Sequence, residues 1–310
     1  MRHEHSFHVP RKTFSVLLVV PLAAGAALAA VNPAKLPLGD GRYTSGTKAG
    51  YVDSCQTAFN GAGAQVNGPW IHGTTWDETA KPSVQGSVKW PSRFSERVAG
   101  SQRVLSGNGL PASPTGVFPI ASSDPAFAYD RNPNSIKAYT LKVSLPANPR
   151  LAASPACVGG TVGVSTLGVP LYSSFDALGR DAGAHEVQDA CGGHPQITGQ
   201  YHFHGLSPCW QDSALSRKTS LVGWALDGFG IYVEHDAKGQ LLSSADLDVC
   251  HGRTSAVDWD GRRVRMYHYD ATLDFPYLVA CFRGTPITSA TGLGIGGGGG
   301  APPPPPGSGP

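Results

Sequence analysis

Two short segments near the C-terminal end carry side chains that are suited to binding a metal ion. They read Tyr201-His202-Phe203-His204 and Tyr267-His268-Tyr269-Asp270. In a β-strand, alternate side chains point to opposite faces, so each segment would present its two polar side chains on one face and its aromatic side chains on the other. Imidazole nitrogens and carboxylate oxygens both serve as ligands for transition metals. The two segments therefore predict a metal site built on β-strands.

The predicted metal ligands come from both segments and from one nearby glycine turn. They are His194, His202, His204, His268 and Asp270. If the two aromatic–histidine strands paired with each other, the four histidines would share a single ion, with Asp270 and Asp227 either binding it or accepting a hydrogen bond that orients a histidine. The donor set favours copper or zinc. The alternative is that the histidines are structural residues, hydrogen-bonded within a tyrosine-rich core.

Two classes of function follow from this pattern, and the sequence leaves the choice between them open. With an open coordination position, zinc would activate water for hydrolysis, with Asp227 as the candidate catalytic base, and copper would support oxidation. The other class is a disulfide-stabilised, non-catalytic module that binds glycans or another envelope protein. A small-molecule or glycan ligand fits these hypotheses. The sequence has no Gly-x-Ser-x-Gly motif, phosphate loop or dinucleotide motif, which argues against serine hydrolases, nucleotide-dependent enzymes and dehydrogenases.

The elements that would position these residues occur twice. Residues 163–209 and 223–281 each contain, in the same order, a glycine-flanked apolar strand, an Asp-x-Cys turn, an aromatic–histidine strand and a closing cysteine. The Asp-x-Cys turns are Asp189-Ala-Cys191 and Asp248-Val-Cys250, and we expect each aspartate to hold its turn as an Asx-turn. Four matched elements in one order predict a tandem duplication, with each copy forming a hairpin or small sheet.

The composition predicts an all-β or β-rich α+β fold. The chain has 40 glycines and 26 prolines but only 15% charged residues, which favours short strands joined by many turns over long amphipathic helices. Residues 138–145 alternate polar and apolar side chains, as a half-buried strand does. The net charge of +2, without any run of lysine or arginine, argues against nucleic acid or an anionic membrane surface as a partner.

The first thirty residues predict export. Arg11 and Lys12 precede an apolar stretch at residues 13–28, and Ala27 and Ala29 supply the small residues that a signal peptidase reads, so we expect residues 1–30 to be a cleaved signal peptide. An uncleaved N-terminal anchor is the alternative. We expect no membrane insertion after cleavage, and a secreted, periplasmic or cell-envelope location. The sequence does not identify a protein partner.

Export implies that the six cysteines form disulfides. Fifteen pairings are open to six cysteines. The equivalent positions of the cysteines in the two copies favour Cys191–Cys209 and Cys250–Cys281, which leaves Cys55–Cys157 for the N-terminal region. The expected division of the chain is the signal peptide, a β-rich N-terminal extension at 31–99, a domain at 100–285 that contains the repeat, and a Gly/Pro-rich disordered tail at 286–310.

Several of these motifs together resemble the YHYH domain family. They are Cys191-Gly-Gly-His194, the segments 201–205 and 223–232, Leu247-Asp-Val-Cys250, Tyr267-His-Tyr269 and the segment 275–284. The resemblance covers roughly residues 100–284 and implies an exported, cysteine-containing domain, without implying a particular activity. Two positions depart from the family pattern. Phe203 replaces the second tyrosine, but we expect it to face away from the histidines, and Asp270 stands where a second histidine would complete another copy.

Overall fold

The computed structural model describes Met1 and residues 31–59, 61, 63–210 and 219–294. Residues 2–30 of the predicted signal peptide and the segment 295–310 of the predicted tail lie outside the described residues. Within the described part of the chain, no helix combines the length and the hydropathy that crossing a bilayer requires.

The described residues form mainly short β-strands, which confirms the predicted β-rich fold. The strands are β1 (Leu36–Pro37), β2 (Tyr43–Thr44), β3 (Val52–Asp53), β4 (Ile71–His72), β5 (Thr75–Trp76), β6 (Phe94–Ala99), β7 (Gln102–Gly107), β8 (Leu141–Pro146), β9 (Thr161–Ser165), β10 (Pro170–Tyr172), β11 (Gly193–Pro195), β12 (Tyr201–Phe203), β13 (Ser220–Ala225), β14 (Gly230–Val233), β15 (Gly252–Trp259) and β16 (Arg262–Asp270). The helical elements are one α-helical turn, α1 (Ala182–His185), and the 3-10 helices η1 (Pro33–Lys35), η2 (Glu78–Ala80), η3 (Pro125–Ala128) and η4 (Ser244–Asp246).

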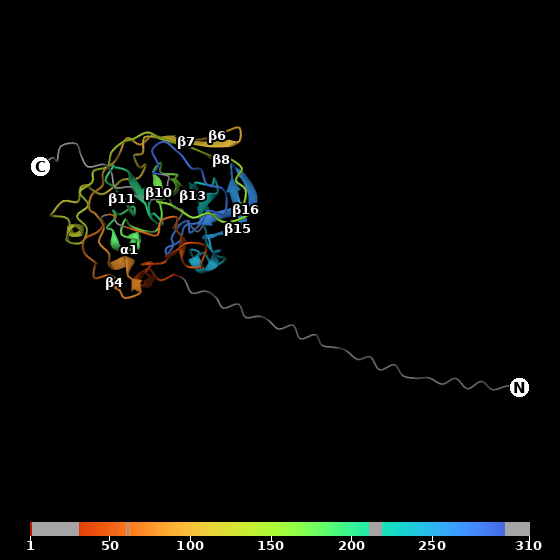
Figure 1. The fold of residues 1–310 in the computed structure, drawn as a ribbon, viewed down its shortest axis with the longest axis horizontal. Helices are drawn as coiled ribbons and strands as arrows, with labels where there is room; N and C mark the ends of the chain where they lie inside the picture. The colour runs from red at the N-terminus through yellow and green to blue at the C-terminus, as the bar shows by residue number, and fades with distance from the viewer. Residues whose placement is uncertain (2–30, 60, 62, 211–218, 295–310) are drawn as a thin grey trace.

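An eight-stranded sheet forms the centre of the molecule. Its strand order is β11-β12-β10-β9-β13-β14-β16-β15, and Figure 1 shows its labelled strands crossing the molecule in this order. The β10–β12 and β14–β16 pairs are parallel and the other pairs are antiparallel. From the central β9–β13 pair outward, one half of the sheet runs β9-β10-β12-β11 and the other runs β13-β14-β16-β15. In both halves the successive pairs are antiparallel, parallel and antiparallel. Each repeat copy thus supplies one half of the sheet, whereas the duplication itself remains a prediction.

The two aromatic–histidine strands do not pair with each other, which corrects the expectation of one shared ion. β12 and β16 are separated by β10, β9, β13 and β14. Five steps of about 4.8 Å put them roughly 24 Å apart along the sheet. The physical reason is the apolar character of β9 and β13: β9 is buried along its whole length and β13 over its last four residues, so these strands take the centre. Strands buried on both faces belong in the middle of a sheet.

The Asp-x-Cys turns have the same hydrogen bonds in both copies. Oδ1 of Asp189 accepts bonds from the backbone N–H of Cys191, at 2.9 Å, and from the hydroxyl of Tyr201, at 2.9 Å. Oδ1 of Asp248 likewise accepts bonds from the backbone N–H of Cys250, at 2.9 Å, and from the hydroxyl of Tyr267, at 3.1 Å. Each aspartate therefore fixes its turn as an Asx-turn, as the sequence predicts.

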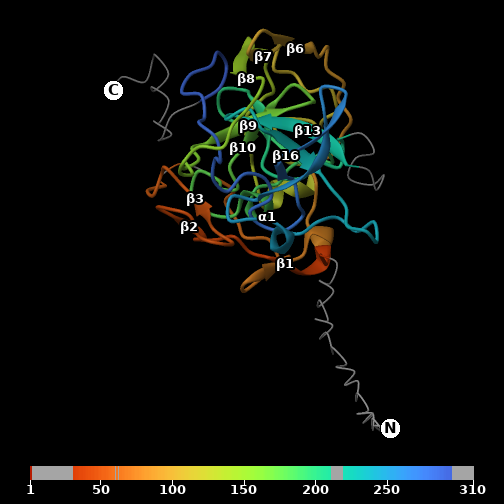
Figure 2. The ribbon, with the colours of Figure 1, turned by 90° about the vertical axis from the view of Figure 1, so that its right-hand side faces the viewer.

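Three disulfides connect the pairs that the repeat favoured: Cys55–Cys157, Cys191–Cys209 and Cys250–Cys281. The first attaches the N-terminal region, which also bonds to the domain through its backbone. The N–H of Asp53 donates to Ala280 O, and its carbonyl accepts from Val158 N, both at 2.8 Å. Figure 2 shows strands β1–β3 on the opposite side of the molecule from the separate three-stranded sheet β6–β7–β8.

The first residues of the segment predicted as a tail pack on the domain. Thr291 exchanges two backbone hydrogen bonds with Lys142, both at 3.0 Å, and Ile287 N donates to Leu226 O, also at 3.0 Å. Leu293 is buried in the core. Residues 286–294 therefore extend the folded part of the chain beyond the boundary expected at 285. The apolar side chains Ile287 and Leu293 explain this, because they offer the core contacts that polyglycine and polyproline cannot make.

Candidate metal centre

Three histidines converge at one edge of the central sheet. His194 on β11 lies opposite His202 on β12, and His204 follows directly after β12 on the same face as His202. One ring nitrogen from each histidine lies within 4.8 Å of the corresponding nitrogens of the other two. All three residues are buried, with 4%, 2% and 5% of their surface exposed. Phe203 points to the other face, where its ring packs on Trp210 at 5.8 Å.

Backbone carbonyls fix the tautomers of two of these rings. His202 Nδ1 lies 3.2 Å from Gln200 O, and His204 Nδ1 lies 2.6 Å from Ser173 O. A carbonyl only accepts, so each Nδ1 carries the proton and donates it, and each neutral ring keeps its lone pair on Nε2. The two Nε2 atoms face each other at 3.0 Å. Two nitrogens bound to one zinc ion at about 2.0–2.1 Å would lie roughly 3–3.4 Å apart, so a cation between them would replace a lone-pair repulsion with two bonds.

A buried carboxylate completes this group. Glu186 Oε2 lies 3.3 Å from Nε2 of His194 and 3.3 Å from Nε2 of His204. Both Glu186 Oε2 and His194 Nε2 are buried without a hydrogen-bond partner. The two atoms face each other as an ion pair and, within the described residues, have no other polar partner except His204, so the place where they meet the three imidazoles is a candidate ligand position. We call His194, His202, His204 and Glu186 the histidine cluster.

Burial sets the charges of the histidine cluster. It lowers the pKa of His204 to about 4 and the pKa of His202 well below its ordinary value, and the neighbouring imidazoles act in the same direction. For His194, burial acts to lower the pKa, but the Glu186 carboxylate outweighs it and the pKa is raised. Burial also opposes ionisation of Glu186, yet His194 lowers its pKa to about 2. At pH 6 the metal-free cluster therefore contains two neutral histidines, one protonated histidine and one carboxylate.

This charge state predicts how many protons an incoming ion displaces. Only His194 has to lose a proton at pH 6, so binding of zinc should release about one proton per ion; three histidines with ordinary pKa values near 6.5 would release roughly two. Calorimetric titration of metal-free protein with zinc at pH 6, in buffers that differ in ionisation enthalpy, measures this number. Release of two or more protons would contradict the assigned charges.

Asp270 and His268 belong to a second, separate group. Their side chains converge with Glu234 from the end of β14, and the ligand atoms of the three residues lie within 4.8 Å of one another. The parallel pairing of β14 with β16, which aligns Tyr232 with Asp270, brings Glu234 to this place. Burial raises the pKa of Asp270 well above its ordinary value, and the nearby Glu234 carboxylate adds to this.

Asp227, predicted as a catalytic base, lies in the turn between β13 and β14 and does not border the histidine cluster. Its carboxylate is buried and accepts hydrogen bonds from the hydroxyl of Tyr269 at 2.6 Å, from Gly284 N at 2.8 Å and from Phe229 N at 3.3 Å. These bonds tie the turn to β16 and to the segment after Cys281. The placement gives Asp227 a structural role.

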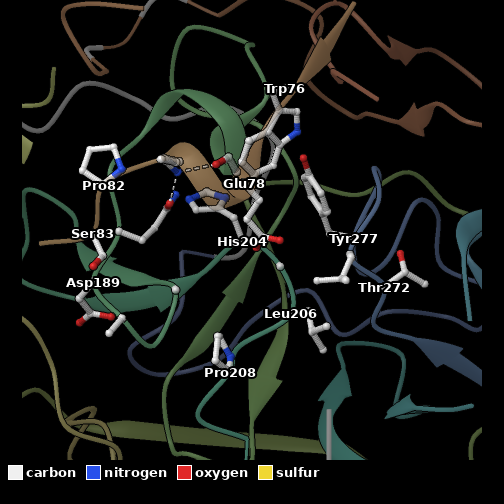
Figure 3. Close-up of a pocket in the computed structure, with 17 residues that line it drawn as sticks. Trp76, Glu78, Pro82, Ser83, Asp189, His204, Leu206, Pro208, Thr272 and Tyr277 are labelled. Carbon is white, nitrogen blue, oxygen red and sulfur yellow. Dashed lines mark hydrogen bonds between the residues drawn. The ribbon is translucent and has the colours of Figure 1, made fainter. Parts of the chain in front are cut away.

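A cavity of about 300 Å³ borders the histidine cluster through His204. Figure 3 shows His204 near its centre, with Trp76 and Glu78 on one side and Leu206 on another. Lys81 also lines the cavity, and its ammonium donates to Gly183 O and to the side-chain oxygen of Gln188. Burial lowers the pKa of Lys81 to about 8, although nearby carboxylates, Asp181 foremost, oppose the shift. The cavity therefore has a candidate metal ligand, His204, and a lysine ammonium, Lys81, among its lining residues.

Sequence reasoning missed the two glutamates and Lys81. Glu186 directly follows α1, Glu234 directly follows β14, and Lys81 lies in the N-terminal extension. None of the three stands in a matched repeat position. A local pattern could not have found them, because long-range pairing and packing bring them to their sites.

The comparison with protein families agrees with the resemblance seen in the sequence. Residues 142–242 match the family model described as YHYH protein, so the chain carries a YHYH domain over this segment. The match includes all four residues of the histidine cluster and Glu234, and it ends before His268 and Asp270. No curated protein and no solved structure matches the chain.

Proposed function

We propose that this YHYH-domain chain is an exported metal-binding protein that holds one copper or zinc ion in the histidine cluster. One observation carries the proposal: the buried His194 Nε2 and Glu186 Oε2 lie 3.3 Å apart and converge with the facing Nε2 atoms of His202 and His204, which are 3.0 Å apart. Three imidazoles and a carboxylate form a donor set that both metals accept. Backbone carbonyls hold His202 and His204 in the binding tautomer, as hydrogen bonds to the outer ring nitrogen orient histidine ligands in metal sites.

Export is part of the same proposal. Three disulfides join all the cysteines, and such bonds persist in oxidising compartments. The predicted signal peptide at 1–30 would direct the chain to the export machinery, and we therefore propose a secreted or cell-envelope location.

We place a small-molecule ligand of the ion in the cavity beside His204. The cavity's volume of about 300 Å³ lies at the lower end of the range for small-molecule sites. The ammonium of Lys81 favours an anionic group on that ligand. A zinc ion there would activate water and a copper ion would support oxidation, so the identity of the metal decides which reaction to assay.

The experiment that tests the proposal is elemental analysis of the mature protein, purified from an exporting host without an immobilised-metal resin. We expect about one equivalent of copper or zinc per chain, lost in the His202→Ala/His204→Ala variant, because both facing ligands are gone. His72→Ala is the matched control, since His72 is exposed on β4 and should leave the metal content unchanged.

Two results would contradict the proposal. One is full metal content in the double variant with its three disulfides intact. The other is a wild-type protein that purifies without copper or zinc, takes up neither, and keeps its stability in chelators. That result would favour the non-catalytic binding module and make the histidines structural.

A further inference from the structure

The structure assigns a second divalent-cation site, of different chemistry, to Glu234, His268 and Asp270. We call these residues the carboxylate cluster. It lies in the other half of the sheet, so an ion there is independent of the one proposed for the histidine cluster. The three residues are 6%, 0% and 0% exposed, and the cluster is therefore enclosed by the fold.

The orphaned carboxylate of Asp270 is the first observation. Both of its oxygens are buried and neither has a hydrogen-bond partner. A buried carboxylate is normally paired, hydrogen-bonded or bound to a metal. The closest cationic candidate is His268, whose Nε2 lies 3.7 Å from Asp270 Oδ2, which is too long for a hydrogen bond.

The tautomer of His268 is the second observation. Its Nδ1 lies 3.1 Å from Met266 O and donates to that carbonyl, so Nε2 is the ring atom that a cation would use. Nε2 lies 3.3 Å from Glu234 Oε2, with which it shares a hydrogen bond in the absence of an ion, and it also faces Asp270. Three potential ligand atoms therefore converge on one point, from β16 and from the residue after β14. A divalent cation at this point would bind all three.

The donor set distinguishes this site from the histidine cluster. Two carboxylates and one imidazole favour a harder ion such as Mn²⁺, whereas three imidazoles favour copper or zinc. At the position where His194 stands opposite His202, Arg253 stands opposite His268. Its Nε lies 3.4 Å from Glu234 Oε2, so it balances part of the charge of Glu234 and does not hydrogen-bond to Asp270. Because the cluster is closed to solvent, the ion is structural.

The test uses Mn²⁺ and the mature His202→Ala/His204→Ala variant, which lacks two ligands of the histidine cluster. The EPR signal of free Mn²⁺ is lost on binding and reports occupancy directly. We expect one Mn²⁺ per chain in this background, and at least a tenfold weaker affinity after a further Asp270→Asn or Glu234→Gln change. Asp236→Asn, which alters one exposed carboxylate in the following turn, is the matched control and should not change the affinity.

Absence of Mn²⁺ binding in the background variant would overturn the inference, whether or not the further variants fold. So would equal affinities in the Asp270→Asn, Glu234→Gln and Asp236→Asn proteins. Either result would assign the cluster to a proton-sharing network of His268, Arg253 and the two carboxylates. Neither result depends on whether the histidine cluster binds copper or zinc in the wild type.

Discussion

Replacing Cys55 and Cys157 together by serine is expected to lower the free energy of unfolding by about 4–5 kcal/mol. This disulfide joins residues 102 positions apart, whereas the other two span 31 and 18 positions. Closing a longer loop removes more conformational entropy from the unfolded chain, so this bond should contribute most of the three. Cys55 is exposed and Cys157 half-buried, so serine fits locally and the effect comes mainly from the unfolded state.

Urea unfolding of the mature protein measures this loss, and the Cys191→Ser/Cys209→Ser variant is the comparison. Its loop of 18 positions predicts a smaller loss, about 3 kcal/mol. The backbone bonds around Asp53 should keep the N-terminal region docked, so near-native circular dichroism is expected at low urea. A smaller loss for the Cys55–Cys157 pair than for the Cys191–Cys209 pair would contradict the loop argument.

The sequence predicts the local features of the fold well. Strand alternation places His202 and His204 on one face and Phe203 on the other, because the two-residue period of a strand is a local property. The matched cysteines predict the disulfide pairs, since equivalent turns recur in both copies. The Asp-x-Cys turns also follow from local chemistry, because the aspartate bonds to backbone N–H groups only two to four residues away.

The global arrangement was not predictable in the same way. The parallel β10–β12 and β14–β16 pairs depend on crossovers, and no short sequence pattern encodes which strands meet. Glu234 reaches Asp270 through such a parallel pair, and Glu186 reaches His194 across a loop. The single predicted metal site therefore becomes two groups, and each contains a glutamate that the repeat alignment does not mark.

One difference between the two copies has a structural explanation. Phe203 in the first copy corresponds to Tyr269 in the second, and Leu167 corresponds to Asp227 in the alignment of residues 163–172 with 223–232. The hydroxyl of Tyr269 donates to Asp227 Oδ2, so the second copy has both partners of a buried hydrogen bond. The first copy lacks both. A hydroxyl and a carboxylate that are gained or lost together leave neither group buried without a partner.

Tyr269→Phe and Asp227→Ala should therefore each destabilise the protein by about 2–4 kcal/mol, because each leaves a buried polar partner unsatisfied. Tyr269→Phe also removes the acceptor of Arg283 N, and Asp227→Ala removes that of Gly284 N. Loss in the double variant should fall short of the sum of the single losses by about 1–3 kcal/mol, since the shared hydrogen bond can be lost only once. Urea unfolding of the four proteins measures this coupling.

The first copy provides the matched control for this cycle. Phe203→Tyr adds the same hydroxyl at a fully buried position where the aligned residue is Leu167, so it should destabilise the protein rather than restore a bond. Additive losses in the second copy would show that Tyr269 and Asp227 act independently. If Phe203→Tyr left the free energy of unfolding unchanged, the hydroxyl would need no carboxylate partner. The paired difference between the two copies would then have no energetic basis.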